Sequence, residues 1–343
     1  MTAVFPDVLV APGTPGLPER FFDRFVFNLH AADGSAPSVI FGIGVYPARD
    51  VIDGFAIVVS SAEQRNLRLS DELSATRATA TGGALGPLSW DVAEPMRTWR
   101  AALGPNPAGL EFDLTWRART PAWTGDVAVA NADGTASSFA HLFQSGRYEG
   151  AVRIGGREVR VDGWYGQRDR SRGVRTMAGG QGLHLWVQAQ FPDRSVGFLT
   201  AESRGHKRLL LAGAVMHESG RLDRVTDVRH DLSFDDGLDL RGGRVKVTTQ
   251  DGAVYRIGAD AAARGGYMSG GGYGGQHGRR MGRGHVEHDA YPLDGSVSPR
   301  VLDSALTDRL TAFTWDGTPG SGIFEFALTR SPGYAYAPTL PRA

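Results

Sequence analysis

A two-residue alternation of apolar and polar side chains runs through most of this chain and limits what it can fold into. Residues 110–117 (LEFDLTWR) show it most clearly, because each apolar residue there is followed by a polar one. Successive side chains of a β-strand point to opposite faces, so the pattern indicates a strand with one buried face. Helical periodicity is hard to find, and no strand–helix–strand order suggests a Rossmann or TIM architecture. The sequence therefore predicts an all-β fold.

Turn-forming residues separate the alternating runs at short intervals. Gln250, Asp251 and Gly252 lie between RVKVTT and AVYRIG, and Gly155-Gly156 lies between residues 147–153 and 158–161. Both arrangements are typical of β-hairpins. Strands that recur every ~8–12 residues indicate a sandwich or a barrel. The further predicted strands are residues 39–46, 55–60, 183–187, 195–202 and 209–217, and a last hairpin pairs 310–315 with 323–328.

The charge balance and the absence of cysteine exclude several classes of protein. The 343 residues contain 37 Lys and Arg against 37 Asp and Glu, and the two signs are interleaved. Because no basic stripe results, we expect no nucleic-acid partner. No segment approaches the ~18 consecutive apolar residues of a membrane helix, so we expect no membrane span. Without cysteine there is no disulfide, thiolate catalyst or cysteine zinc site. The N-terminus lacks a signal-peptide pattern, so a cytoplasmic location is the expectation.

A glycine-rich segment, residues 264–289, interrupts the strand pattern. Ten of the twenty residues from 265 to 284 are glycine. We predict a loop that covers a barrel mouth. An alternative is a tract that binds RNA or another protein, with Tyr267 and Tyr273 as stacking groups. Glycines near residues 176–182 mark the easiest domain boundary, so the predicted domains are residues 1–178 and 179–343.

Several histidines are candidates for chemistry. His285, Glu287 and His288 lie close together in the sequence, but their spacing matches no metal-site template, and we predict no metal. His141 and His184 fall inside apolar strand runs. Each is either a hydrogen-bonded core histidine or a group that faces a cavity.

The densest group of reactive side chains is residues 163–175 (GWYGQRDRSRGVR). One interpretation makes Asp169 the ion partner of Arg168 or Arg170. The other makes it a partly buried carboxylate at a cavity edge, beside Trp164 and Tyr165. In a strand, the even-numbered arginines share one face and Asp169 takes the other. If the arginines face solvent, Asp169 points inward.

The same region resembles the carotenoid 1,2-hydratase and AttH-like superfamily. The similarity is sharpest at GQRDRSRGVR (166–175), which follows a hairpin ending in residues 156–163. The lead-in HLFQSGRYEG (141–150) is also similar, as are FFDRFVF (21–27), WTGD (123–126) and WDGTPGSGIFEF (315–326). The resemblance implies two tandem lipocalin-like (calycin) antiparallel β-barrel domains. It also implies a relation to hydratases and cyclases that protonate or fold hydrophobic polyenes.

This sequence departs from the hydratase pattern at two positions. Where the hydratases carry His after the aspartate and Trp two positions further on, this chain has Arg170 and Arg172. A guanidinium does not release its proton near neutral pH, so Arg170 cannot replace a proton-donating histidine. We therefore place the chain in an uncharacterised branch of the superfamily, with Asp169 retained as a candidate acid.

The expected function is that of a lyase or isomerase, of hydratase or cyclase type, that needs no cofactor. The supply of aromatic residues, with 7 Trp, 9 Tyr and 16 Phe, favours a hydrophobic isoprenoid, polyene, steroid or polyketide ligand. Asp169 is the predicted catalytic acid. One alternative is a carrier that binds such a ligand without catalysis, and another is an interaction module that uses the glycine-rich loop. The predicted substrate-binding residues are Trp123, His141, Trp164, Tyr165, Arg168, His184 and His285.

Overall fold

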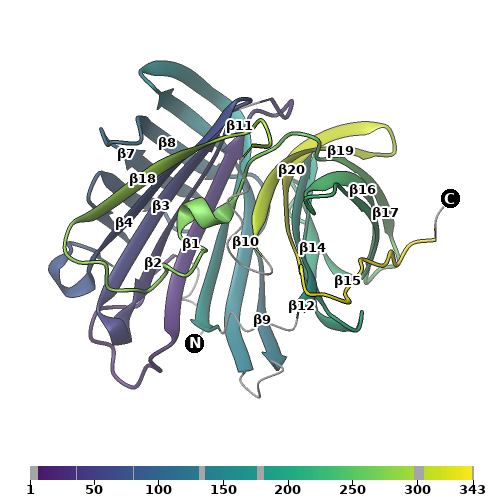
Figure 1. The fold of residues 1–343 in the computed structure, drawn as a ribbon, viewed down its shortest axis with the longest axis horizontal. Helices are drawn as coiled ribbons and strands as arrows, with labels where there is room; N and C mark the ends of the chain where they lie inside the picture. Colours follow the sequence, from purple (N-terminus) through teal and green to yellow (C-terminus); the bar gives the residue numbers. More distant parts are fainter. Residues whose placement is uncertain are drawn as a thin grey trace.

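The computed structural model describes residues 7–35, 37–79, 81–130, 136–175, 181–296 and 305–341. Across these residues the regular structure is β-strand, with three single-turn 3₁₀ segments and no α-helix. The predicted all-β fold is confirmed. The strands form two units that lie side by side, a curled open sheet and a closed barrel (Figure 1).

The curled sheet contains the N-terminal strands and one strand from much later in the chain. Its antiparallel order is β18-β4-β3-β2-β1-β11-β10-β8-β7-β6-β5, with β9 paired to β10 beside this path. Its strands are β1 (Phe21–His30), β2 (Ser38–Tyr46), β3 (Val51–Val59), β4 (Glu63–Glu72), β5 (Gly82–Leu85), β6 (Leu88–Glu94), β7 (Thr98–Leu103), β8 (Leu110–Ala118), β9 (Trp123–Ala130), β10 (Ala136–Ile154), β11 (Arg157–Val174) and β18 (His285–Pro292).

The barrel closes because its last strand, β20, pairs with its first, β12. Its strands are β12 (Gln181–Phe191), β13 (Arg194–Ser203), β14 (Arg208–His217), β15 (Leu222–Phe234), β16 (Leu240–Thr249), β17 (Val254–Asp260), β19 (Thr307–Trp315) and β20 (Thr318–Leu328). The hairpins predicted around Gly155-Gly156 and around residues 250–252 are confirmed as β10–β11 and β16–β17.

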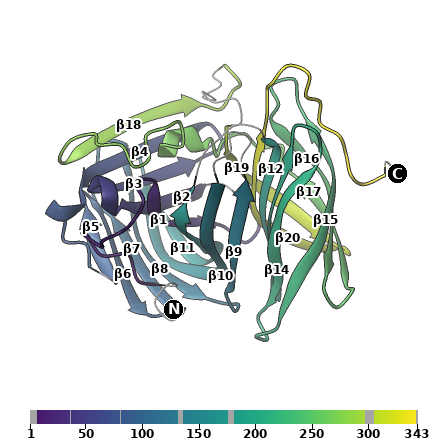
Figure 2. The same ribbon diagram turned by 90° about the horizontal axis from the view of Figure 1, so that it is seen from below.

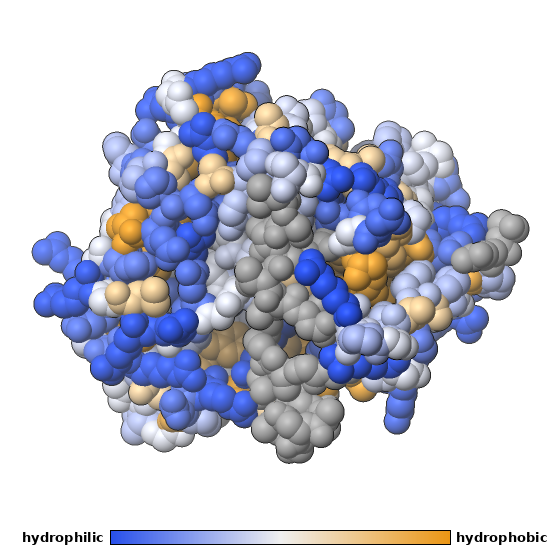
Figure 3. Space-filling view, in the orientation of Figure 1, coloured by the Kyte–Doolittle hydropathy of each residue, from blue (hydrophilic) through white to orange (hydrophobic). Residues whose placement is uncertain are grey.

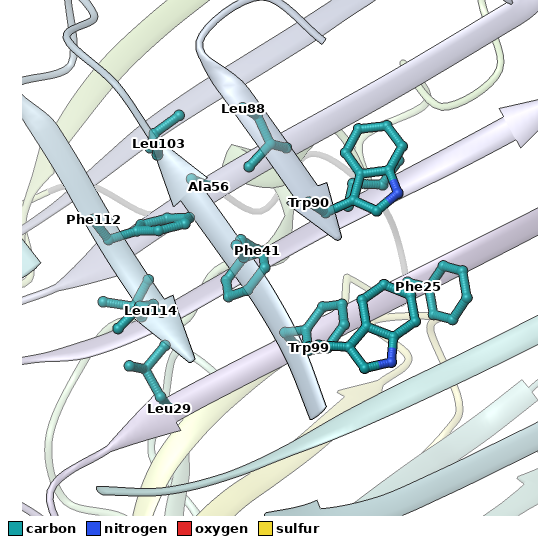
Figure 4. Packing of buried hydrophobic residues seen from close by; sticks show 14 of the residues in the cluster. Phe25, Leu29, Phe41, Ala56, Leu88, Trp90, Trp99, Leu103, Phe112 and Leu114 are labelled. Carbon is teal, nitrogen blue, oxygen red and sulfur yellow. The ribbon is translucent and has the colours of Figure 1, made fainter. Parts of the chain in front are cut away.

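Apolar side chains fill the interior of each unit. Inside the curled sheet, the rings of Phe25 and Trp99 lie 4.6 Å apart, and Phe41 lies 4.9 Å from Phe112 (Figure 4). The barrel has its own cluster, which includes Phe198, Phe313 and Phe324. Because the alternate residues of each strand pack inward, the residues between them are left for the outer faces of the two units.

The glycine-rich segment lies against the outer face of β3 and β4. It contains a 3₁₀ turn, η3 (Met268–Gly271), and Tyr267 and Met268 are buried against Phe55 and Ile57. A Cβ at Gly270 would collide with the Asn66 side chain, so glycine permits this close approach. This position corrects the expected loop over a barrel mouth, because glycine lets the segment lie flat on a sheet.

The segment also contains more regular structure than the sequence predicted. Residues 285–289, expected as loop, begin strand β18, which pairs with β4 and runs along the edge of the curled sheet (Figure 2). The alternation of HVEHDAYP is that of an edge strand with one side exposed. The domain boundary at residue 178 falls outside the described residues and stays a prediction.

The surface carries few large apolar side chains. Among the described residues, the exposed ones are Leu222, Val254 and Val286, and the face in Figure 3 is mostly hydrophilic. The described part of the chain also contains no helix of the length and apolarity that crossing a membrane requires. The apolar side chains that could contact a ligand therefore lie mainly inside the protein rather than on its surface.

Candidate functional site

A cleft lies between the curled sheet and the barrel. It holds about 50 Å³ of open space. The outer faces of β1, β10 and β11 form one wall, and those of β12, β19 and β20 form the other. Met268 and Tyr273 of the glycine-rich segment also line it. We call this space the cleft.

Strand β11 presents opposite chemistry on its two faces. Asp169 and Ser171 face the cleft, whereas Arg168 and Arg170 face the interior of the curled sheet and are fully buried. The predicted alternation is therefore correct. The condition attached to it, that the arginines face solvent, is wrong, because the sheet curls over them.

The buried arginines have carboxylate partners far away in the sequence. Arg168 pairs with Asp7, and Arg170 Nη2 lies 2.7 Å from Asp23 Oδ2. Arg172 shares Asp23 at 3.0 Å. Burial lowers the pKa of Arg170 to about 10, although the charge of Asp23 opposes this shift. The interpretation of Asp169 as the ion partner of Arg168 or Arg170 is therefore wrong.

Asp169 is instead hydrogen-bonded to His141. Oδ2 of Asp169 lies 2.5 Å from Nε2 of His141, which extends from the neighbouring strand β10. Both side chains are buried, with the aspartate 9% exposed. The rings of Phe139 and Trp123 contact the imidazole edge-on, each with its centroid 5.9 Å away. Two groups that sequence analysis treated separately thus form one pair in an apolar setting.

The barrel wall carries a second set of acidic groups. Glu325 of β20 accepts a hydrogen bond from His184 of β12 at 2.7 Å, and it also interacts with Asp308 of β19. Asp308 lies directly opposite Glu325 in the β19–β20 pairing. The cleft therefore brings three carboxyl groups and two imidazoles together.

The two barrel carboxyls are driven toward different protonation states. Burial raises the pKa of Asp308 well above its ordinary value, and the charge of Glu325 and then that of Asp169 raise it further. Burial also acts to raise the pKa of Glu325, but the hydrogen bond and charge of His184, the hydrogen bond with Asp308 and the charge of Arg175 together outweigh burial and lower it. Asp308 thus keeps its proton over a wider pH range than an ordinary aspartate, beside an ionised Glu325.

Asp308 and Glu325 were not predicted from the sequence. Glu325 is the single charged residue in GIFEFAL, and Phe324 and Phe326 on either side of it point into the barrel. The alternation therefore placed Glu325 on the outer face, where a carboxylate is ordinary. Nothing local indicates that the curled sheet covers that face.

The structure brings only part of the predicted site together. His141, Asp169 and His184 line the cleft, and Trp123 lies behind His141, stacked on Phe143 at 4.7 Å. The described residues contain no group of three His, Asp or Glu side chains arranged to hold a metal ion.

The other predicted residues lie elsewhere. Trp164 packs in the interior of the curled sheet, as does Arg168. Tyr165 lies beneath the guanidinium groups of Arg119 and Arg147, at 4.7 and 4.9 Å from its ring. His285 is in β18, 3.6 Å from Glu287, and is not among the residues that line the cleft.

Residues 10–333 match the profile of a family of unknown function, DUF8625. The chain belongs to this family. A comparison with curated proteins finds no match.

Solved structures share the fold over almost the entire chain. An AttH-like protein (NE1406) from Nitrosomonas europaea is 13% identical with a TM-score of 0.62, covering 95% of this chain and 100% of its own. Kievitone hydratase from Nectria haematococca is 11% identical with a TM-score of 0.53, covering 95% and 97%. CghA, solved with Sch210972, is 13% identical with a TM-score of 0.54, covering 97% of each chain. At these identities the likeness establishes the fold.

Proposed function

We propose that the chain is a lyase or isomerase, of hydratase or cyclase type, that acts on a hydrophobic unsaturated substrate without a cofactor. The observation that carries this proposal is the pairing in the cleft of Asp308, whose pKa is raised, with the hydrogen-bonded Asp169–His141 pair on the opposite wall. A group that holds a proton and a group that can accept one are the requirements of general acid–base catalysis.

In this proposal Asp308 is the proton donor. Its carboxyl proton forms a new C–H bond at an alkene carbon of the substrate, and the alkene electron pair becomes that bond. The positive charge that develops at the adjacent carbon is stabilised by the charge of Glu325 and by the faces of aromatic rings such as Trp186, which lines the cleft. Asp169, the acid predicted from the sequence, is assigned to the opposite wall, where it orients His141.

Two outcomes follow from the same cation. In a hydration, a water oxygen bonds to the cationic carbon and passes a proton to His141. In a cyclisation, a second double bond of the substrate attacks instead, and His141 removes a proton from the product cation. His141 then releases its proton to solvent, and solvent returns a proton to Asp308. The aspartate holds the imidazole in one orientation, as carboxylates do in catalytic pairs.

The lining of the cleft supports an apolar substrate. Between the acidic groups it presents Val26, Leu199, Met268 and Leu306. Isoprenoids, polyenes, steroids and polyketides are chemical classes whose molecules combine an apolar surface with carbon–carbon double bonds. The named hydratase among the solved structures has the same fold, which is compatible with this class of reaction.

The test compares metabolites of the native host under four conditions. The gene is deleted, and the deletion strain is complemented with the wild type, with Asp308→Asn, or with Asp162→Asn, an exposed carboxylate of β11 as the matched control. We expect an unsaturated compound to accumulate in the deletion and Asp308→Asn strains. Its product should have the same mass or one additional water. Loss of a general acid lowers turnover by about 10²–10⁴-fold.

Three results would contradict the proposal. If Asp308→Asn restores the wild-type metabolites in full, Asp308 is not the proton donor. If the deletion changes only compounds related by oxidation or group transfer, the reaction class is wrong. If the metabolites are unchanged throughout and the chain instead captures RNA or another protein, the glycine-rich segment has the interaction role.

A further inference from the structure

A second pocket adjoins the cleft at its outer end. It has a volume of about 190 Å³ and shares Arg24, Arg175 and Tyr273 with the cleft. The wall between the two spaces includes the ring of Tyr273, whose pKa burial raises to about 12. We call this space the outer pocket. Its shared residues make it an extension of the cleft rather than a separate site.

The lining of the outer pocket is cationic and aromatic. Arg20, Arg24, Arg49 and Arg175 contribute to it, together with Phe22, Tyr46 and Tyr273, and no carboxylate does. Excess positive charge in a partly enclosed space attracts an anion, because low-dielectric walls strengthen the field there.

Three of these arginines have their donors directed at uncharged groups. Arg24 donates to the Tyr46 hydroxyl, and its Nε is buried without a hydrogen-bond partner in the described part of the chain. Arg49 donates to the backbone carbonyls of Glu19 and Gly278. The guanidinium of Arg175 lies 5.3 Å from the Phe139 ring centroid. Among the described residues, none of the three forms an ion pair with a carboxylate, although the charge of Asp53 acts on Arg24 and that of Glu325 on Arg175. An incoming anion would therefore not have to displace a carboxylate from them.

The cleft and the outer pocket therefore differ in charge. The cleft carries Asp169, Asp308 and Glu325 beside the two shared arginines, whereas the outer pocket is lined by arginines and by no carboxylate. An anionic group is therefore bound more favourably in the outer pocket than in the cleft. The outer pocket is also smaller than the ~300–1,000 Å³ typical of complete ligand sites, so it suits one end of a longer molecule.

We propose that the outer pocket binds an acidic end group of the substrate, a carboxylate or an acidic enol, conjugated to an aromatic or unsaturated body. This inference rests on the proposed function, because it takes the cleft as the reaction site. Arginine forks match the two oxygens of such an anion, and Phe22 and Tyr46 cover its apolar stem. The anionic end thus fixes which double bond reaches Asp308.

Equilibrium dialysis with two matched probes tests this inference. The probes are 1-naphthoate and 1-naphthalenemethanol, which have the same rings and differ in charge. We expect the wild type to bind the acid about tenfold more tightly than the alcohol, the ratio expected for a charge-assisted hydrogen bond. Arg49→Gln and Arg175→Gln should each remove most of that preference. Arg160→Gln, which alters an exposed arginine of β11, should keep it.

Equal binding of the two probes, no binding of either, or an unchanged preference in both pocket variants would overturn the inference. Circular dichroism of each variant identifies any that fails to fold, and the second pocket variant then decides. Asp308 does not line the outer pocket, so naphthoate binding and the metabolite change are independent measurements. Naphthoate selectivity without the metabolite change would therefore defeat the proposed function alone, and the reverse result would defeat the outer-pocket inference alone.

Discussion

The barrel and the curled sheet seal their interiors in different ways. The barrel pairs β20 with β12, so its backbone hydrogen bonds close around a cylinder. The curled sheet ends at β5 on one side and β18 on the other. Residues near the N-terminus help to fill its interior. There, Asp7 forms an ion pair with Arg168 and accepts a hydrogen bond from the indole N–H of Trp99. A closed barrel removes its edges, whereas an open sheet needs other contacts to complete its core.

Because of this difference, the charged side chains on the two faces of β11 have different roles. On the inner face of β11, the arginines and their distant carboxylates hold the open sheet together. On its outer face, Asp169 lines the cleft together with the acidic groups of the barrel. The inner charges should therefore affect stability, and the outer ones should affect activity.

The largest expected effect is the loss of Asp23. Asp23→Asn leaves Arg170, which is fully buried, and Arg172 without their carboxylate. Breaking a buried ion pair from one side costs about 3–5 kcal/mol of unfolding free energy. Urea denaturation measures this loss of unfolding free energy. The matched variant in the barrel is Asp231→Asn, which removes the partly exposed pair with Arg244 and should cost about 1 kcal/mol or less. Equal losses would show that the two units do not differ in this respect.

The second prediction concerns pH and the barrel side of the cleft. The folded protein holds the Asp308 proton more tightly than the unfolded chain does, where the pKa is about 3.8. The stability that this provides is complete below pH 3.8 and is lost as pH rises through the raised pKa. Asp308→Asn lacks that decline, so the variant should gain stability relative to the wild type as the pH rises. Thermal melts from pH 5 to 8 measure the difference, and parallel curves would refute it.

The smallest expected effect on stability is that of Asp169→Asn. The amide keeps the shape and can still hydrogen-bond to His141, so the unfolding free energy should change by about 1 kcal/mol or less. Turnover should nevertheless be abolished, because His141 loses the carboxylate that orients it. A melting temperature as low as that of Asp23→Asn, with surviving turnover, would assign Asp169 a structural role instead.

The local sequence pattern was sufficient to predict the strands but insufficient to predict the contacts between them. The alternation in residues 110–117 predicted both β8 and its buried face, and β11 was predicted to separate Asp169 from its neighbouring arginines. The environment of those arginines depends on Asp7 and Asp23, which are distant in the sequence. An arginine-bearing face normally indicates solvent, so no local rule predicts that β11 is buried on both sides.

The part of the site that was not predicted from the sequence was missed for the same reason. Asp308 and Glu325 acquire their character only because the barrel packs against the curled sheet, and that orientation is set by contacts between distant residues. Arg119, for example, donates to the carbonyl groups of Phe191 and Arg194. The glycine-rich segment was recognisable by composition. Its placement depends on Asn66 and Phe55, the surfaces that glycine allows it to approach.

The position of β18 has a consequence for the synthesis of the chain. Residues 285–292 are made after β17, yet they pair with β4, which ends at residue 72. Until they emerge from the ribosome, β4 has a row of backbone donors and acceptors without the partner strand that covers it in the finished protein. Such an edge is a template for pairing with other chains. Translation therefore leaves the N-terminal unit incomplete for most of its duration, and we expect a nascent chain arrested before residue 285 to depend on chaperones.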